Sequence, residues 1–239
     1  IKKGNLKDNI NLKQHIINKK DILIFDLDDT LYNELDFVYQ GLRQVSFILE
    51  KRTKINNRKI FKELKNILKK NGRGKIFDFY CKKKNIYSST LIKNLINEYR
   101  FSNKKINLDS GYKKILNFLK KKHSLYLVTD GYWRVQSKKV QLLKIRKYFK
   151  KIYYTDYYGK KASKPSLICF RKIKIEEKCK WGDMVYFGDN QQKDFKNLNI
   201  VGSKTFFVSR WCKIKKKYPK IYNANFKISN LKQINKCLD

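Results

Sequence analysis

Short runs of consecutive hydrophobic residues alternate along the chain with longer segments whose hydrophobic residues recur every three or four positions. The short runs have the length and composition of strands buried on both faces of a parallel sheet. They occupy residues 22–25, 125–128, 152–154, 184–187 and 205–208. The segments between them, with the spacing of helices, are 111–122, 135–148, 166–175 and 194–199, and a last short strand (225–228) and helix (231–238) follow. This alternation predicts an α/β fold with a doubly wound, Rossmann-like parallel sheet.

Residues 36–103 interrupt the alternation of strands and helices. Their hydrophobic residues follow helical spacing, and no segment among them has the pattern of a strand. The pattern therefore predicts a small all-helical domain inserted after the first strand. We expect a core domain formed by residues 1–33, with an N-terminal helix and the first strand, and by residues 105–239. The helical domain between them covers residues 34–104.

The chain is strongly basic, with 58 Lys and Arg residues against 20 Asp and Glu and a net charge of +38. Such a charge can indicate a nucleic-acid partner. However, Lys outnumbers Arg by 49 to 9, and the basic residues are spread over the whole chain. Proteins that bind nucleic acids favour Arg, whose planar group suits phosphates and base edges. A general drift in composition is the better explanation, so a nucleic-acid partner is not the leading expectation, although attraction of anionic substrates follows on either interpretation.

Cysteine and histidine usage excludes several kinds of site. The five cysteines are widely spaced without a C-x-x-C pair, which argues against a disulfide framework and a structural zinc site. The only two histidines, His15 and His123, nearly exclude chemistry built on histidine clusters. No hydrophobic run approaches the roughly 18–20 residues of a membrane span. We therefore expect a cytoplasmic protein without a membrane partner.

Acidic or small polar residues follow three of the predicted strands. They are Asp26 and Asp28 after the first strand, Thr129, Asp130 and Gly131 after the second, and Asp189 and Asp194 after the fourth. Ligands of open parallel sheets bind at the carboxyl ends of the strands, so these residues are expected at one edge. Carboxylates packed together need a cation, and ligation by oxygen alone suits Mg²⁺. The sequence thus predicts a magnesium site that involves Asp26, Asp28, Asp189 and Asp194.

These motifs resemble those of the haloacid dehalogenase superfamily of hydrolases. Four elements match in order: Asp26-x-Asp28-x-Thr30, Thr129, Lys164-Pro165, and Gly188-Asp189 with Asp194. The resemblance extends from about Asp21 to the end of the chain. It implies the phosphatase type of the superfamily, in which a helical insert between the first two motifs is a cap over the active site.

The resemblance also implies a role for each matching residue. Asp26 would attack phosphorus and form an aspartyl-phosphate. Asp28 would protonate the leaving oxygen and then deprotonate water, a role that calls for a raised pKa. Mg²⁺ would be held by the Asp26 and Asp189 carboxylates and the Asp28 backbone carbonyl, with Asp194 bound directly or through one water. Thr129, backbone N–H groups of Asp130 and Gly131, and Lys164 would hold the phosphoryl oxygens.

The predicted function is that of a Mg²⁺-dependent phosphatase acting on a small phosphorylated metabolite, either a sugar phosphate or a nucleoside monophosphate. A phosphotransferase or mutase that uses the same aspartyl-phosphate is an alternative, as is a basic module associated with nucleic acid. Dehalogenation is disfavoured because those enzymes lack an acid at the position of Asp28. On the helix after Thr129, the residues Gln136, Lys138 and Lys139 are predicted to form a solvated basic face.

Overall fold

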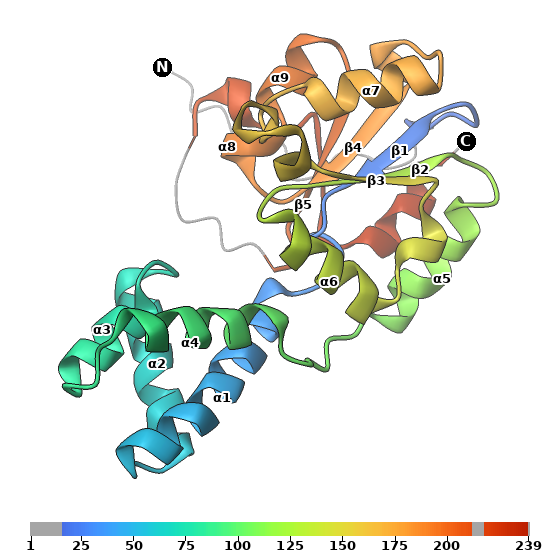
Figure 1. Ribbon diagram of the computed structural model, residues 1–239. Helices are drawn as coiled ribbons and strands as arrows, with labels where there is room; N and C mark the ends of the chain where they lie inside the picture. Colours follow the sequence, from blue (N-terminus) through green and yellow to red (C-terminus); the bar gives the residue numbers. More distant parts are fainter. Residues whose placement is uncertain (1–15, 212–217, 239) are drawn as a thin grey trace, which may run out of the picture. The chain divides into compact units, whose positions relative to one another are not determined.

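The computed structural model describes residues 16–211 and 218–238 (Figure 1). The chain divides into two compact units, a core unit formed by Ile1–Asn33 and Leu108–Asp239, and a helical unit formed by Glu34–Asn107. The N-terminal helix predicted before the first strand falls on residues that lie outside the described ranges.

The core unit is built on a six-stranded sheet in which every neighbouring pair of strands is parallel. The strand order is β3-β2-β1-β4-β5-β6. The strands are β1 (Ile22–Phe25), β2 (Leu125–Thr129), β3 (Lys151–Tyr154), β4 (Met184–Gly188), β5 (Lys204–Val208) and β6 (Phe226–Ile228). The order reverses beside β1, which lies between β2 and β4 and therefore places the ends of these three strands together. The predicted α/β fold with a doubly wound parallel sheet is confirmed.

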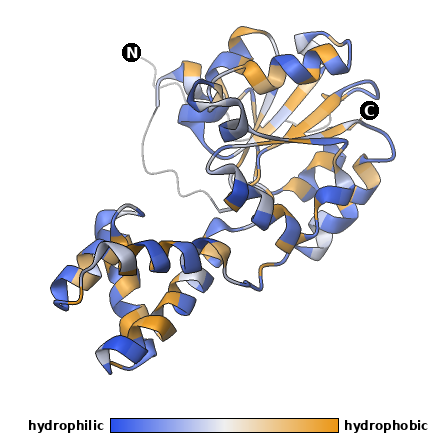
Figure 2. Cartoon of the chain, in the orientation of Figure 1, coloured by the Kyte–Doolittle hydropathy of each residue, from blue (hydrophilic) through white to orange (hydrophobic). Residues whose placement is uncertain are grey.

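A ladder of phenylalanine rings ties four of the strands together. Phe25 stacks on Phe187 with ring centroids 4.8 Å apart, Phe187 on Phe206 at 5.0 Å, and Phe206 on Phe226 at 4.8 Å. Each pair occupies directly opposed positions in the sheet register. Cross-strand aromatic pairs of this kind stabilise a sheet and fix its register. The strands are also among the most hydrophobic elements of the core unit (Figure 2).

Helices cover both faces of the sheet, with α7 and α9 on one side and α5 and α6 on the other (Figure 1). Phe170 and Ile173 of α7 pack with Tyr186 of β4 in one hydrophobic core on the first face. The helices of the core unit are α5 (Ser110–Leu119), α6 (Trp133–Leu143), α7 (Ile168–Glu176), α8 (Gln191–Asp194) and α9 (Lys196–Ile200). A 3-10 helix, Leu231–Lys236, takes the place of the last predicted helix.

The helical unit has a hydrophobic core of its own. It consists of α1 (Glu34–Thr53), α2 (Asn57–Asn71), α3 (Ile76–Lys83) and α4 (Ser89–Phe101). Leu42, Val45 and Leu49, spaced along one face of α1, pack with Ile60 and Leu64 of α2. That the unit acts as a cap over the active site stays a prediction. In the described ranges, no helix is both long and apolar enough to cross a membrane.

Candidate active site

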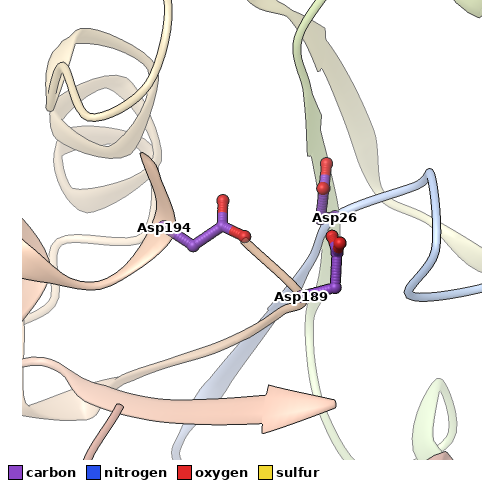
Figure 3. A group of neighbouring side chains, drawn as sticks. All are labelled: Asp26, Asp189 and Asp194. Carbon is purple, nitrogen blue, oxygen red and sulfur yellow. The ribbon is translucent and has the colours of Figure 1, made fainter. Parts of the chain in front are cut away.

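Three of the predicted aspartates form one cluster at the carboxyl edge of the sheet. Asp26 directly follows β1, Asp189 directly follows β4, and Asp194 is the last residue of α8. Each offers one carboxylate oxygen to a group whose members all lie within 4.8 Å of one another (Figure 3). Residues far apart in the sequence meet here because β1 and β4 are neighbouring parallel strands.

A glycine makes room for the third carboxylate. A Cβ atom at Gly188 would lie 2.5 Å from Oδ2 of Asp194 and 2.7 Å from its Cγ, so no larger residue fits here without displacing Asp194. The backbone N–H of Asn190 donates to the same Oδ2 at 2.8 Å. The Asn190 side chain in turn accepts from the N–H of Gln192 and caps α8. The Gly188-Asp189-Asn190 turn thus positions Asp194 as well as Asp189.

Lys164 is a buried cation beside this cluster. Its Nζ lies 3.0 Å from Oδ1 of Asp26 and 2.8 Å from Oδ1 of Asp194. The same Nζ donates to the Tyr186 hydroxyl at 2.9 Å, and that hydroxyl donates to Asp194 at 3.0 Å. Sequence reasoning found Lys164 through its motif but missed Tyr186, whose place in a hydrophobic strand gives no sign of a polar role.

Burial and mutual repulsion disfavour the ionised forms of the clustered carboxyl groups and so raise the pKa of two of them. Burial, together with the neighbouring Asp194, raises the pKa of Asp26 to about 7 against the opposing effect of Lys164. Burial, Asp194 and Asp26 raise the pKa of Asp189 to about 9. One lysine therefore does not compensate three carboxylates, two of them buried and one half-buried. An all-oxygen, electron-rich site of this kind fits a hard divalent cation such as Mg²⁺.

These shifts predict how the stability of the metal-free protein depends on pH. The folded state retains protons on Asp26 and Asp189 that the unfolded chain releases near its ordinary carboxyl pKa. Since the folded state binds more protons, stability must be lost as the pH rises towards the two folded pKa values. In EDTA we expect the melting temperature to fall between about pH 5 and about pH 9, and Asp189→Asn to reduce that fall. A melting temperature that rises with pH over this interval would contradict the assignment.

Asp28 lies outside the carboxylate cluster and has its own partners. The Lys139 Nζ lies 2.8 Å from Oδ1 and 2.7 Å from Oδ2 of Asp28. Gln136 donates to Oδ2 at 2.9 Å, and the Tyr32 hydroxyl donates to Oδ1 at 2.7 Å. Burial alone would raise the pKa of Asp28, but Lys139, Gln136 and Tyr32 outweigh it and lower that pKa. The Asp28 side chain is thus held as a carboxylate. The metal contact expected through its backbone carbonyl stays a prediction.

Two predictions from the sequence are wrong here. The raised pKa expected for Asp28 is replaced by a lowered one, because three donors face its two oxygens. The predicted solvated face of α6 is wrong for Gln136 and Lys139, which are only 2% and 4% exposed. Lys138 is half-buried. Periodicity could not reveal these contacts, since a charged residue on a helix usually faces water.

The residues after β2 lie next to this second group. The buried Thr129 hydroxyl accepts a hydrogen bond of 2.7 Å from Gln136. The Asp130 carboxylate accepts from the Thr155 hydroxyl at 2.7 Å and from the backbone N–H of Lys164 at 3.1 Å, so it joins three loops. Gly131 is exposed and has a positive φ of 111°, which glycine adopts without strain. Phosphate binding by these residues and by Lys164 stays a prediction.

The order of these elements matches a known family. The model of the haloacid dehalogenase-like hydrolases matches residues 23–208, a stretch that runs from β1 to the end of β5. The chain belongs to the haloacid dehalogenase-like hydrolase family. The family resemblance predicted from the sequence motifs is thereby confirmed. None of the curated proteins compared with the chain matches it.

Solved structures of this hydrolase family share the fold over nearly the whole chain. The magnesium-bound HAD hydrolase YfnB from Bacillus subtilis has a TM-score of 0.69 and 20% identity, over 92% of this chain and 99% of its own. A HAD phosphatase from Thermococcus onnurineus has a TM-score of 0.57 and 20% identity, over 90% and 96%. A 2-haloacid dehalogenase from Pseudomonas syringae has a TM-score of 0.63 and 16% identity, over 91% and 97%. At these identities the likeness concerns the fold.

Proposed function

We propose that this hydrolase is a Mg²⁺-dependent phosphatase that cleaves a small phosphate monoester through an aspartyl-phosphate on Asp26. The observation that carries the proposal is the pairing of two carboxylates two residues apart in opposite surroundings. Asp26 lies among carboxylates and Lys164, whereas Asp28 is held by three hydrogen-bond donors. Two neighbouring carboxylates whose surroundings shift their pKa values in opposite directions usually have different catalytic roles.

The cofactor proposed for the cluster is Mg²⁺. Asp26, Asp189 and Asp194 would supply carboxylate oxygens, and the Asp28 backbone would supply a carbonyl oxygen. When bound, the ion supplies positive charge that keeps the carboxylates ionised and draws electron density from the phosphoryl group. The magnesium bound to YfnB, a protein of the same fold, supports this choice.

In the first step, a carboxylate oxygen of Asp26 attacks phosphorus while the bond from phosphorus to the leaving oxygen breaks. Lys164 stabilises the ionised form of Asp26 through the contact of 3.0 Å between Nζ and Oδ1. Thr129 and the N–H groups of the turn after β2 bind the phosphoryl oxygens as their charge redistributes. The leaving oxygen takes up a proton from solvent water and departs as an alcohol.

In the second step, water attacks phosphorus and Asp28 accepts the proton that this water gives up. The bond between phosphorus and Asp26 breaks, inorganic phosphate leaves, and the Asp26 carboxylate is restored. Asp28 then releases its proton to solvent, which restores its own carboxylate. The three donors around Asp28 support this role, because an ionised carboxylate is the form that accepts a proton. They favour Asp28 as the base of the second step over Asp28 as the acid of the first.

Asp28 also supports phosphate-ester hydrolysis over dehalogenation, although a haloacid dehalogenase is among the proteins with this fold. A carbon–halogen bond releases a halide ion, which needs no proton at neutral pH. A phosphate ester releases an alkoxide that does need one, and hydrolysis of the intermediate also needs a base. The Asp28 carboxylate, close enough to Asp26 to affect its pKa, can act as that base in phosphate-ester hydrolysis.

The test is release of inorganic phosphate from a panel of sugar phosphates, nucleoside monophosphates and one aryl phosphate. We expect turnover of the aryl phosphate and of at least one metabolite in millimolar Mg²⁺, and none in EDTA. Asp189→Asn should remove most of the response to Mg²⁺, because it removes a carboxylate of the cluster. Product analysis separates a phosphatase from a mutase, since a mutase releases no phosphate. No turnover of any compound would contradict the proposal.

A further inference from the structure

Gln136 and Lys139 form a buried polar pair on α6, and no step of the proposed reaction has yet used it. The two residues are three positions apart, so their side chains lie on one face of the helix. Both are almost completely buried. A buried ammonium group carries a large desolvation cost and is retained only with close partners. The partner here is Asp28, with both carboxylate oxygens within 2.8 Å of Nζ.

Gln136 links Asp28 to the strand that carries Thr129. Its amide nitrogen lies 2.9 Å from Oδ2 of Asp28, 2.7 Å from the Thr129 hydroxyl oxygen and 2.6 Å from the backbone carbonyl oxygen of Asp130. An amide nitrogen has two hydrogens, so these three acceptors share them. Because the Thr129 hydroxyl accepts from Gln136, its own hydrogen can be donated, as binding of a phosphoryl oxygen requires.

We propose that Gln136 and Lys139 are positioning residues for phosphoryl transfer, which orient the Asp28 carboxylate and the Thr129 hydroxyl from one face of α6. The inference rests on the proposed phosphatase function. These two side chains would keep the loop that contains Asp28 in a fixed position relative to the end of the strand that carries Thr129. One helix holds both of them through its side chains, and a misplacement of about 1 Å can cost a catalytic group roughly 10²-fold in rate.

A purely structural role is the alternative, in which Lys139 only neutralises a buried charge. The two roles predict different effects on activity when substitutions of Lys139 and Asp28 are combined in one protein. If Lys139 acts through Asp28, Lys139→Met should lower activity in the wild-type background and have no further effect in the background of Asp28→Asn. If Lys139 serves the fold alone, the effects of the two substitutions on activity should be independent.

The experiment measures kcat and KM with an aryl phosphate for Asp28→Asn, Lys139→Met and the double variant. We expect Lys139→Met to lower kcat by about 10²-fold with KM within about twofold, since a positioning loss affects the reacting state more than substrate binding. Lys139→Arg, which keeps the charge, should recover part of the loss. Gln136→Met should also lower kcat. Lys138→Met is the matched control, because it changes a half-buried lysine on the same helix and should leave kcat unchanged.

Wild-type-like kcat in both Lys139→Met and Gln136→Met would overturn the inference, as would a further loss when Lys139→Met is added to Asp28→Asn. If Lys139→Met alone does not fold, the double variant, which lacks both charges of the pair, still tests the role of Lys139. Its kcat is then compared with that of Asp28→Asn alone. Failure of the wild-type protein to release phosphate would instead refute the proposed function.

Discussion

Replacement of Asp26 by Asn is expected to reduce phosphate release to the uncatalysed background. The amide has nearly the shape of the carboxylate but lacks the oxygen nucleophile, so no covalent intermediate can form. Because the Asp26→Asn variant also lacks one of three crowded carboxylates, its metal-free form should melt at a higher temperature than the wild-type protein near neutral pH. Loss of activity together with retained or increased stability excludes misfolding as its cause.

The matched control for this variant is Asp29→Asn. Asp29 lies in the same loop, is half-buried and has a φ of 53°, a conformation that Asn also tolerates. Its side chain is not part of the carboxylate cluster, so we expect wild-type activity. Both variants would be assayed for phosphate release and for melting temperature. Substantial activity in Asp26→Asn would show that another group attacks phosphorus.

Replacement of Asp28 by Asn is expected to lower turnover by about 10²–10⁴-fold, the usual contribution of a general acid or base. We expect this loss to fall mainly on the second step of the proposed reaction. Since Asp28 is held as a carboxylate, the task proposed for it is to accept a proton from water in the second step. An aryl phosphate, whose leaving group needs little acid assistance, should still transfer its phosphoryl group to Asp26. The variant should then stall.

Rapid mixing of Asp28→Asn with an aryl phosphate measures this stall directly. We expect a burst of about one equivalent of aryl alcohol per protein with almost no release of inorganic phosphate. The melting shift produced by Mg²⁺ should persist, because the side chain of Asp28 lies outside the carboxylate cluster. A ligand that binds only the folded state stabilises it by roughly 2.7 kcal/mol at a hundredfold excess over Kd. Turnover equal to that of the wild-type protein would contradict the role of Asp28.

Much of the core unit could be predicted because its strands carry an unambiguous signal. The first predicted strand coincides with β1, and the second, fourth and fifth differ from β2, β4 and β5 by one residue at one end. Strands buried on both faces appear in the sequence as continuous hydrophobic runs, so the length and composition of a run suffice to identify such a strand. The cluster of Asp26, Asp189 and Asp194 followed from the geometry of parallel strands, whose ends share an edge.

The surroundings of Asp28 could not be predicted in the same way. Lys139 is 111 positions away from Asp28, and it is one of 49 lysines in the chain. A sequence pattern assigns a lysine on a helix to the solvent side, because it contains no information on a partner from another strand. Tyr186 is the opposite case, because a residue in a hydrophobic strand has a polar role. It looks like a core residue of β4, and its hydroxyl group meets Lys164 and Asp194 only in the folded sheet.

The most direct test of the proposed covalent mechanism is to locate the phosphoryl group in the stalled Asp28→Asn variant. The protein would be quenched in acid after reaction with an aryl phosphate in Mg²⁺, digested, and its peptides weighed and sequenced by mass spectrometry. We expect one added phosphoryl group, on the peptide that contains Asp26, and none in the double variant with Asp26→Asn. A phosphoryl group on any other residue, or inorganic phosphate released by the wild-type protein without any phosphorylated Asp26 in the stalled variant, would contradict that mechanism.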